Sequence, residues 1–273
     1  AESTWTGTAK LDGGDSKPIA DLISDWQTKG GVLQLQSACT YTTDATFNVT
    51  GTNTLDLNGQ NLIWNAGADV ANAISIGANG NLTISGNDAV QNVLSFDCQR
   101  DAAVAISSAN ALAVKVAKIA SKGSNGVVVK VTAEQGAFSI ENSAIELGDN
   151  MKFGIDLAGT AEGVSSNFTN VKISCTGNEH SVFGAAAIYT KRQCTFENLC
   201  IDMSGYNEQK ACYGIRLIGG DSKSYIKGEN TSIKMNNHAS SVAVRVESRL
   251  YLTIDAGEFT APSMLGSNGY IVP

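Results

Sequence analysis

Short stretches in which apolar and polar residues alternate recur along most of the chain, and turns rich in Gly and Asn separate them. Such alternation is typical of strands that bury one face, and branched aliphatic residues fill many of the apolar positions. No stretch with helical periodicity separates these repeats. The pattern therefore predicts an all-β fold and argues against alternating strands and helices.

Four of these stretches share the pattern Asn-x-x-Ile-x-(Leu/Cys/Met). They begin at Asn142, Asn170, Asn198 and Asn230, which are 28, 28 and 32 residues apart. A repeat of this length is the signature of a solenoid, an array or a propeller. Because each repeat holds about three short strands, we expect a single-stranded parallel β-helix of about eight to nine coils. Equivalent residues of successive coils should stack about 4.8 Å apart.

Two apolar rows and one row of turn residues recur once per repeat, and we expect both apolar rows to stack in the core. The first apolar row is Leu55, Leu82, Leu112, Phe138, Phe168, Phe196, Ile226 and Leu252. The second is Leu62, Ala89, Ile119, Ile145, Ile173, Ile201, Ile233 and Phe259. The turn row is Gly59, Gly86, Val116, Asn142, Asn170, Asn198, Asn230 and Ala256. Gly and Asn tolerate a left-handed backbone, and we expect the four Asn side chains to form an internal amide ladder.

Residues 17–28 differ from the rest because their apolar side chains follow helical spacing. These side chains are Ile19, Leu22, Ile23 and Trp26. Pro18 suits a first helical turn, and the Gly pair at 30–31 ends the segment. A short amphipathic helix here would cap the open core, as solenoids require. We therefore expect one domain over residues 1–273, with coils at 31–260 and a tail at 261–273 that forms an irregular cap or continues in a longer protein.

Composition and charge exclude two classes of protein. The net charge is −7 and the isoelectric point is about 4.9, which argues against a nucleic-acid binder because phosphate binding needs clustered Lys and Arg. No apolar run is long enough to span a membrane. The start Ala1-Glu2-Ser3 is typical of a mature chain after removal of an export signal. We therefore expect a secreted or cell-surface protein.

The six cysteines do not show metal-ligand spacing. They are Cys39, Cys98, Cys175, Cys194, Cys200 and Cys212. No Cys-x-x-Cys motif occurs, and His180 and His238 have no partner at ligand spacing, so we expect no metal and no cofactor. Cys175 and Cys194 should point inward. The spacing leaves open whether the thiols fill the core or whether one disulfide forms among Cys175, Cys194, Cys200 and Cys212.

The helical cap, the first coil at 31–36, the segment Thr54-Leu-Asp-Leu-Asn-Gly59 and the Asn repeat together resemble the pectin/pectate-lyase-like superfamily. The resemblance implies a right-handed parallel β-helix, an architecture shared by polysaccharide lyases, glycoside hydrolases, phage tailspikes and adhesins. The catalytic motifs Arg-x-Pro-x-x-Arg, Asn-Thr-Asp, Asp-Asp, Gly-His-Gly and Arg-Ile-Lys are absent. Since a shared solenoid does not assign an activity, the resemblance implies a member without the known catalytic motifs.

One candidate for catalysis lies on the second strand of the coils. Glu146 and Asp202 should face outward two coils apart, about 10 Å, with Ser174 between them. That separation is compatible with a pair of glycosidase carboxylates. Charged residues are also the ordinary occupants of an outward strand face, so a solvated face is the competing interpretation.

The third strand carries a second candidate. Its outward residues on successive coils are Lys130, Asp156, Tyr189, Arg216 and Arg245. Two stacked guanidinium groups suit bidentate binding of a carboxylate or sulfate, and Tyr189 suits stacking on a sugar. The competing interpretation is that acids such as Glu247 neutralise the arginines and that the stripe is a solvated face.

These features favour an exported, adhesin-like β-helix that binds a polysaccharide or a host-surface glycan without catalysis. One alternative is a polysaccharide lyase or glycoside hydrolase of unrecognised type, with a cleft lined by Asp156, Asp202, Arg216 and Arg245. Another is a structural segment of a larger surface or phage-fibre protein. The pattern does not fix the ligand or the oligomeric state.

Overall fold

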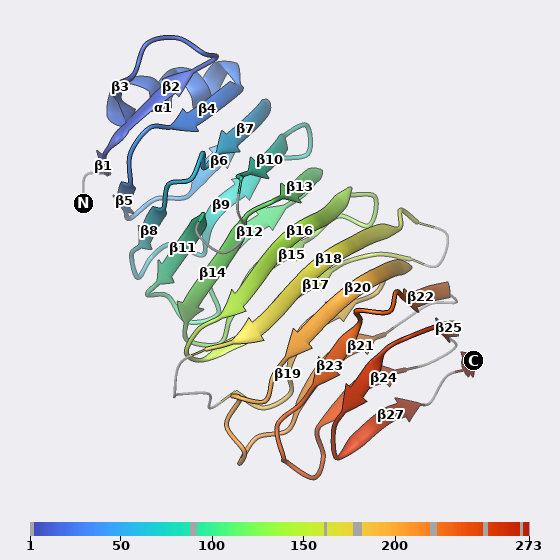
Figure 1. Ribbon diagram of the computed structural model, residues 1–273. Coiled ribbons are helices and arrows are strands. Elements are labelled where there is room, and N and C mark those ends of the chain that lie inside the picture. Colours follow the sequence, from blue (N-terminus) through green and yellow to red (C-terminus); the bar gives the residue numbers. More distant parts are fainter. Residues whose placement is uncertain are drawn as a thin grey trace.

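The computed structural model is a stacked parallel β-helix that runs from a short helix at the N-terminal end to the C-terminal strands (Figure 1). It describes residues 3–87, 92–160, 163–176, 182–218, 223–247, 251–267 and 270–272. Each coil adds one strand to a nine-stranded sheet, called sheet B here, and two strand segments to a 19-stranded sheet, called sheet A. The predicted all-β solenoid is confirmed, and the nine strands of sheet B agree with the expected eight to nine coils.

Sheet A holds the first and second strands of the coils. The first strands are β4 (Gly31–Leu35), β7 (Thr52–Asp56), β10 (Asn81–Ser85), β13 (Ala111–Lys115), β22 (Lys223–Lys227), β25 (Tyr251–Ile254) and β28 (Tyr270–Val272). The second strands are β5 (Cys39–Thr43), β8 (Leu62–Ala66), β11 (Val93–Cys98), β14 (Lys118–Gly123), β23 (Ser232–Lys234) and β26 (Glu258–Thr260). In three coils both segments merge into one long strand: β16 (Phe138–Leu147), β18 (Ser166–Cys175) and β20 (Cys194–Asp202).

Sheet B holds the third strand of each coil. Its members are β6 (Phe47–Val49), β9 (Asn72–Ile76), β12 (Val104–Ser108), β15 (Gly126–Val131), β17 (Met151–Leu157), β19 (Ala185–Thr190), β21 (Cys212–Leu217), β24 (Val242–Val246) and β27 (Ser263–Ser267). Successive strands pair in parallel in both sheets, so equivalent residues of neighbouring coils lie beside one another. This stacking creates the residue columns from which a binding face is built.

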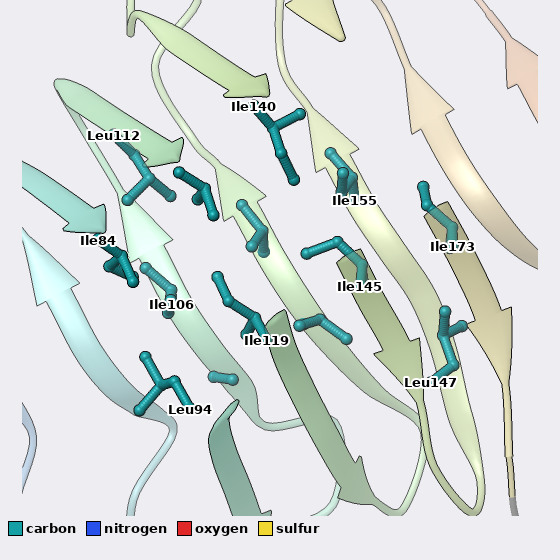
Figure 2. Packing of buried hydrophobic residues seen from close by; sticks show 14 of the residues in the cluster. Ile84, Leu94, Ile106, Leu112, Ile119, Ile140, Ile145, Leu147, Ile155 and Ile173 are labelled. Carbon is teal, nitrogen blue, oxygen red and sulfur yellow. The ribbon is translucent and has the colours of Figure 1, made fainter. Parts of the chain in front are cut away.

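The second apolar row forms a continuous inward column, as predicted. Ile119 pairs with Ile145, and Ile145 pairs with Ile173; Figure 2 shows these side chains among the other buried aliphatic residues. One position differs, because the coil expected to contribute Ala89 contributes Leu94 instead. Ala89 itself lies outside the described residues.

The first apolar row is offset by two residues in several coils. Phe168 pairs with Phe196 as expected, but its partner in the preceding coil is Ile140 rather than Phe138. The ring of Phe138 still lies in the shared core, 5.7 Å from the ring of Phe168. The expected row mixes two inward columns, one with Leu55, Ile84, Val114, Ile140, Phe168, Phe196 and Ile226 and one with Leu82, Leu112, Phe138 and Leu252. Strands β10, β13 and β16 have apolar side chains at both inward positions, so their alternation alone cannot distinguish the two columns. Strands β7, β18 and β22 instead carry the buried polar residues Asn53, Ser166 and Ser224 in the second column.

The Asn residues occupy the corner between the two segments of sheet A. Asn142, Asn170 and Asn198 have φ angles of 48°, 52° and 52°, which is the left-handed region that Asn tolerates. Their side chains lie at the surface, so the expected internal ladder is wrong. One link of an external ladder is present, where the amide of Asn170 donates to Oδ1 of Asn142 at 3.0 Å. Asn230 is exposed and the corner of its coil is at Gly228, with φ 97°.

The N-terminal end of the core is closed by α1 (Ile19–Lys29), which confirms the predicted cap helix. Ile19 is fully buried and Trp26 is 3% exposed; the Trp26 ring packs on Phe47 at 5.7 Å. Three short antiparallel strands, which the sequence did not reveal, complete this end: β1 (Thr4–Thr6), β2 (Thr8–Leu11) and β3 (Lys17–Pro18). Such capping protects strand edges that would otherwise invite pairing.

At the other end the stack continues beyond residue 260. β27 pairs with β24, and β28 pairs with β25, so these residues extend the two sheets where an irregular tail was one expectation. Pro273 lies outside the described residues. Within the part of the chain that the structure describes, no helix is long and apolar enough to cross a membrane.

All six cysteines are free thiols in this structure. Cys194 is fully buried in the core, as expected, whereas Cys175 packs against the core but stays partly exposed. Burial raises the pKa of both thiols to about 12. Four thiols, those of Cys39, Cys98, Cys194 and Cys212, are buried as the core-filling interpretation expects, whereas Cys175 and Cys200 are partly exposed. The structure contains no disulfide among the six.

Candidate ligand-binding face on sheet B

The strands of sheet B do not follow strict period two, and this irregularity gives the sheet two outward columns. In β12, Ala105 and Ile106 are consecutive and both point into the core. The same pair of a small and a branched inward residue recurs in the next coils, for example Ala187 with Ile188 in β19. One residue before each pair and one residue after it therefore face outward.

The first outward column is apolar. Its members on successive coils are Val104, Val127, Phe153, Ala186, Tyr213 and Val242. Val104, Val127, Phe153 and Ala186 form a hydrophobic cluster of their own, apart from the main core, against which Tyr189 and Tyr213 pack. Sequence reasoning missed this column because it assumed strict alternation, although the repeated pair of inward residues was visible in the sequence.

The second outward column contains the five predicted residues in the predicted order. Lys130 pairs with Asp156, Asp156 with Tyr189, Tyr189 with Arg216, and Arg216 with Arg245. All five side chains are partly exposed. The parallel register therefore brings together residues that are 115 positions apart in the sequence, from 130 to 245.

Aromatic rings from both columns support Arg216. The rings of Phe153 and Tyr189 stack at 4.6 Å with an interplanar angle of 15°. The Arg216 guanidinium lies 5.5 Å from the centre of the Tyr189 ring and 5.2 Å from that of Tyr213. Both distances suit cation–π attraction, so the rings hold the guanidinium over this surface.

Glu247, just after β24, neutralises part of the charge of the two arginines. Its carboxylate accepts hydrogen bonds from Nε and Nη2 of Arg216, both at 3.3 Å. The same carboxylate accepts a hydrogen bond from Nε of Arg245 at 3.4 Å. Stacked like charges repel, and this bridge explains why the two guanidinium groups can occupy neighbouring coils. The competing interpretation from the sequence was therefore right about the role of Glu247 as a partner.

Positive charge nevertheless predominates on this surface. Burial raises the pKa of the Asp156 carboxyl, and the positive charges of Lys130, Lys191 and Lys152 oppose that rise. Burial also raises the pKa of Tyr189, and the positive charge of nearby Arg216 opposes this rise. Among the described residues of this surface, two carboxylates thus face five cations in a protein whose net charge is −7. We call this surface the cationic face; it comprises Lys130, Lys152, Phe153, Asp156, Tyr189, Lys191, Tyr213, Arg216, Arg245 and Glu247.

The candidate catalytic carboxylates lie elsewhere, on the outer surface of sheet A. Glu146 pairs with Ser174 and Ser174 with Asp202, which is the predicted arrangement. The Glu146 carboxylate forms an ion pair with Lys118 and accepts a hydrogen bond from Thr176 at 2.9 Å. Asp202 accepts a hydrogen bond from the backbone N–H of Ser204 at 2.9 Å. Both carboxylates therefore have local partners.

The two carboxylates also line separate shallow hollows of about 390 Å³ each. Because Asp202 belongs to sheet A while Asp156, Arg216 and Arg245 belong to sheet B, the single cleft expected from these four residues is wrong. Among the residues with described positions, no group of three or more His, Cys, Asp or Glu side chains could hold a metal ion. His180 lies outside the described residues.

No family model, no curated protein and no solved structure matches the chain.

Proposed function

We propose that this protein is an exported, adhesin-like β-helix of the pectin/pectate-lyase-like type that binds an acidic glycan through the cationic face of sheet B, without catalysis. The observation that carries the proposal is the concentration of five cations and three aromatic rings on neighbouring coils of an acidic protein. Guanidinium groups bind carboxylate and sulfate groups with directional hydrogen bonds. Tyrosine offers an apolar ring with a polar tip for contact with a sugar.

Rigidity supports the same proposal. Eight of the ten residues of the face lie on paired strands, and the other two, Lys191 and Glu247, directly follow strands. Its central guanidinium contacts two rings and a carboxylate. A surface that is already ordered loses little side-chain entropy when a ligand binds. The coils repeat about every 4.8 Å, so an extended polymer lying along the stack would meet one set of side chains per coil.

The test is retention of the purified protein on immobilised polysaccharides. We expect binding to polygalacturonate or dextran sulfate, little binding to neutral dextran, and weaker binding as salt rises, because exposed charges are screened. The double variant Arg216→Ala/Arg245→Ala should weaken binding at least about tenfold, which corresponds to 1.4 kcal/mol.

The matched control is Lys172→Ala/Lys234→Ala, which removes two exposed cations from sheet A and should change affinity less than about twofold. Equal loss in both double variants would show that net charge alone governs retention and would refute the assignment of this face. Release of reducing or unsaturated ends from any polymer would replace the binding proposal with the enzymatic alternative.

A further inference from the structure

The Glu247 carboxylate occupies a position that suits an external anion. Both of its oxygens face Arg216, with Nε to Oε1 and Nη2 to Oε2 at 3.3 Å each, and Oε1 also lies 3.4 Å from Nε of Arg245. Two oxygens opposite two N–H donors of one guanidinium are the arrangement in which arginine binds carboxylates of its ligands. The space between the two arginines is therefore an anion position, and a side chain of the protein fills it.

Each arginine also has neighbours other than Glu247. Arg216 lies against the rings of Tyr189 and Tyr213. Arg245 runs over the backbone of Gly266, where a β-carbon would lie 3.1 Å from its Cδ atom. Each arginine side chain therefore has contacts on this surface besides those with the carboxylate.

Glu247 is held less firmly. Its backbone is fixed, since its N–H donates to the carbonyl of Leu217 at 2.9 Å. The hydrogen bonds and ion pairs described for its side chain all go to the two arginines, and 24% of that side chain is exposed. Rotation about its side-chain bonds would move the carboxylate into solvent while the backbone and both arginines stay in place.

We propose that Glu247 is an internal competitor that an anionic group of the ligand displaces from between Arg216 and Arg245. This inference rests on the proposed function and adds a specificity-determining residue to it. A site that is occupied by its own side chain binds more weakly by the fraction of time it is open. Only a polymer that brings a carboxylate or sulfate to this position and contacts the lysines of neighbouring coils outcompetes the internal carboxylate.

The experiment compares dissociation constants of the wild type, Glu247→Gln and Glu258→Gln for polygalacturonate, dextran sulfate and dextran. Gln keeps the size of Glu but removes the competing charge. We expect Glu247→Gln to bind an acidic polymer about 5- to 10-fold more tightly, as for a site that its own side chain occupies about four-fifths to nine-tenths of the time. The polymer with the larger gain identifies the anion. Glu258, which is exposed on β26 of sheet A, controls for the loss of one negative charge and should change affinity less than about twofold.

The outcomes separate the two proposals. If the wild type binds an acidic polymer but Glu247→Gln binds it equally or more weakly, the competitor role is refuted and the binding face stands. An equal gain in Glu258→Gln would also refute it, because the total charge would then explain the effect. If neither the wild type nor Glu247→Gln binds either acidic polymer, both proposals fail.

Discussion

Among the described residues, Arg192 is the only charged side chain that is buried, at 1% exposure. It follows β19 and reaches back across two earlier coils. Its Nη2 atom donates to the carbonyl of Ala133 at 3.1 Å, its Nη1 atom to that of Gly136, and its Nε atom to that of Ala158 at 2.6 Å. Burial lowers the pKa of this guanidinium, yet the carbonyl oxygens replace the water that it gives up.

The substitution Arg192→Met keeps a long side chain and removes all of these donors. Hydrogen bonds to a charged group contribute about 1.5–3 kcal/mol each, and an unsatisfied buried acceptor costs about 1–3 kcal/mol. Removing the buried charge also removes its desolvation cost, which offsets part of the loss. We therefore expect a net loss of about 3 kcal/mol in the free energy of unfolding. At about 2–3 °C per kcal/mol for a chain of this length, Tm should fall by about 6–9 °C.

Thermal and urea denaturation would measure the change, and hydrogen exchange would locate it. The loops at 132–137 and 158–160 should exchange faster in the variant, since Arg192 connects them. Arg100→Met is the matched control, because Arg100 is exposed and donates to one carbonyl at 3.2 Å; its cost should stay within about 0.5 kcal/mol. If Arg192→Met lowers stability by less than 1 kcal/mol, roughly the worth of one hydrogen bond, Arg192 does not hold these loops together.

Two further predictions concern the corners and the thiols. Asn170→Val should lower the free energy of unfolding by about 1–2 kcal/mol because a branched residue is strained at φ 52°. Asn170→Gly should lower it by less than about 0.5 kcal/mol. Equal losses of stability in the two variants, measured by thermal denaturation, would contradict the role of the left-handed corner. Burial raises the pKa of Cys194 from 9.0 in the unfolded chain to about 12, so its contribution to stability is complete below pH 9 and is lost as the pH rises towards 12. In the native protein, Cys194 should resist a thiol-alkylating reagent at pH 8 and react only after unfolding, whereas the partly exposed Cys200 should react first. Early labelling of Cys194 would show that its coil opens in the native state.

The local pattern of apolar and polar residues was sufficient to predict the secondary-structure elements and the order in which the coils stack. The alternation of apolar residues, the repeat of about 28 residues and the helical spacing at Ile19 and Trp26 specified strands, coils and the cap. The column from Lys130 to Arg245 was also predictable. A strand places every second residue on one face, and a fixed repeat brings equivalent residues of successive coils together.

Tertiary structure decided the features in which two local solutions are equally good. Phe138 and Ile140 both point inward, so contact with the next coil, rather than local pattern, determined that Ile140 opposes Phe168. Asn can occupy a left-handed corner whether its side-chain amide points into the core or into solvent, and the fold places the amide of Asn170 in solvent. Pairs of consecutive inward residues in sheet B depend on how the backbone packs against the neighbouring coil. Those pairs turned Tyr213 towards Arg216 and created the face that the alternating pattern alone did not contain.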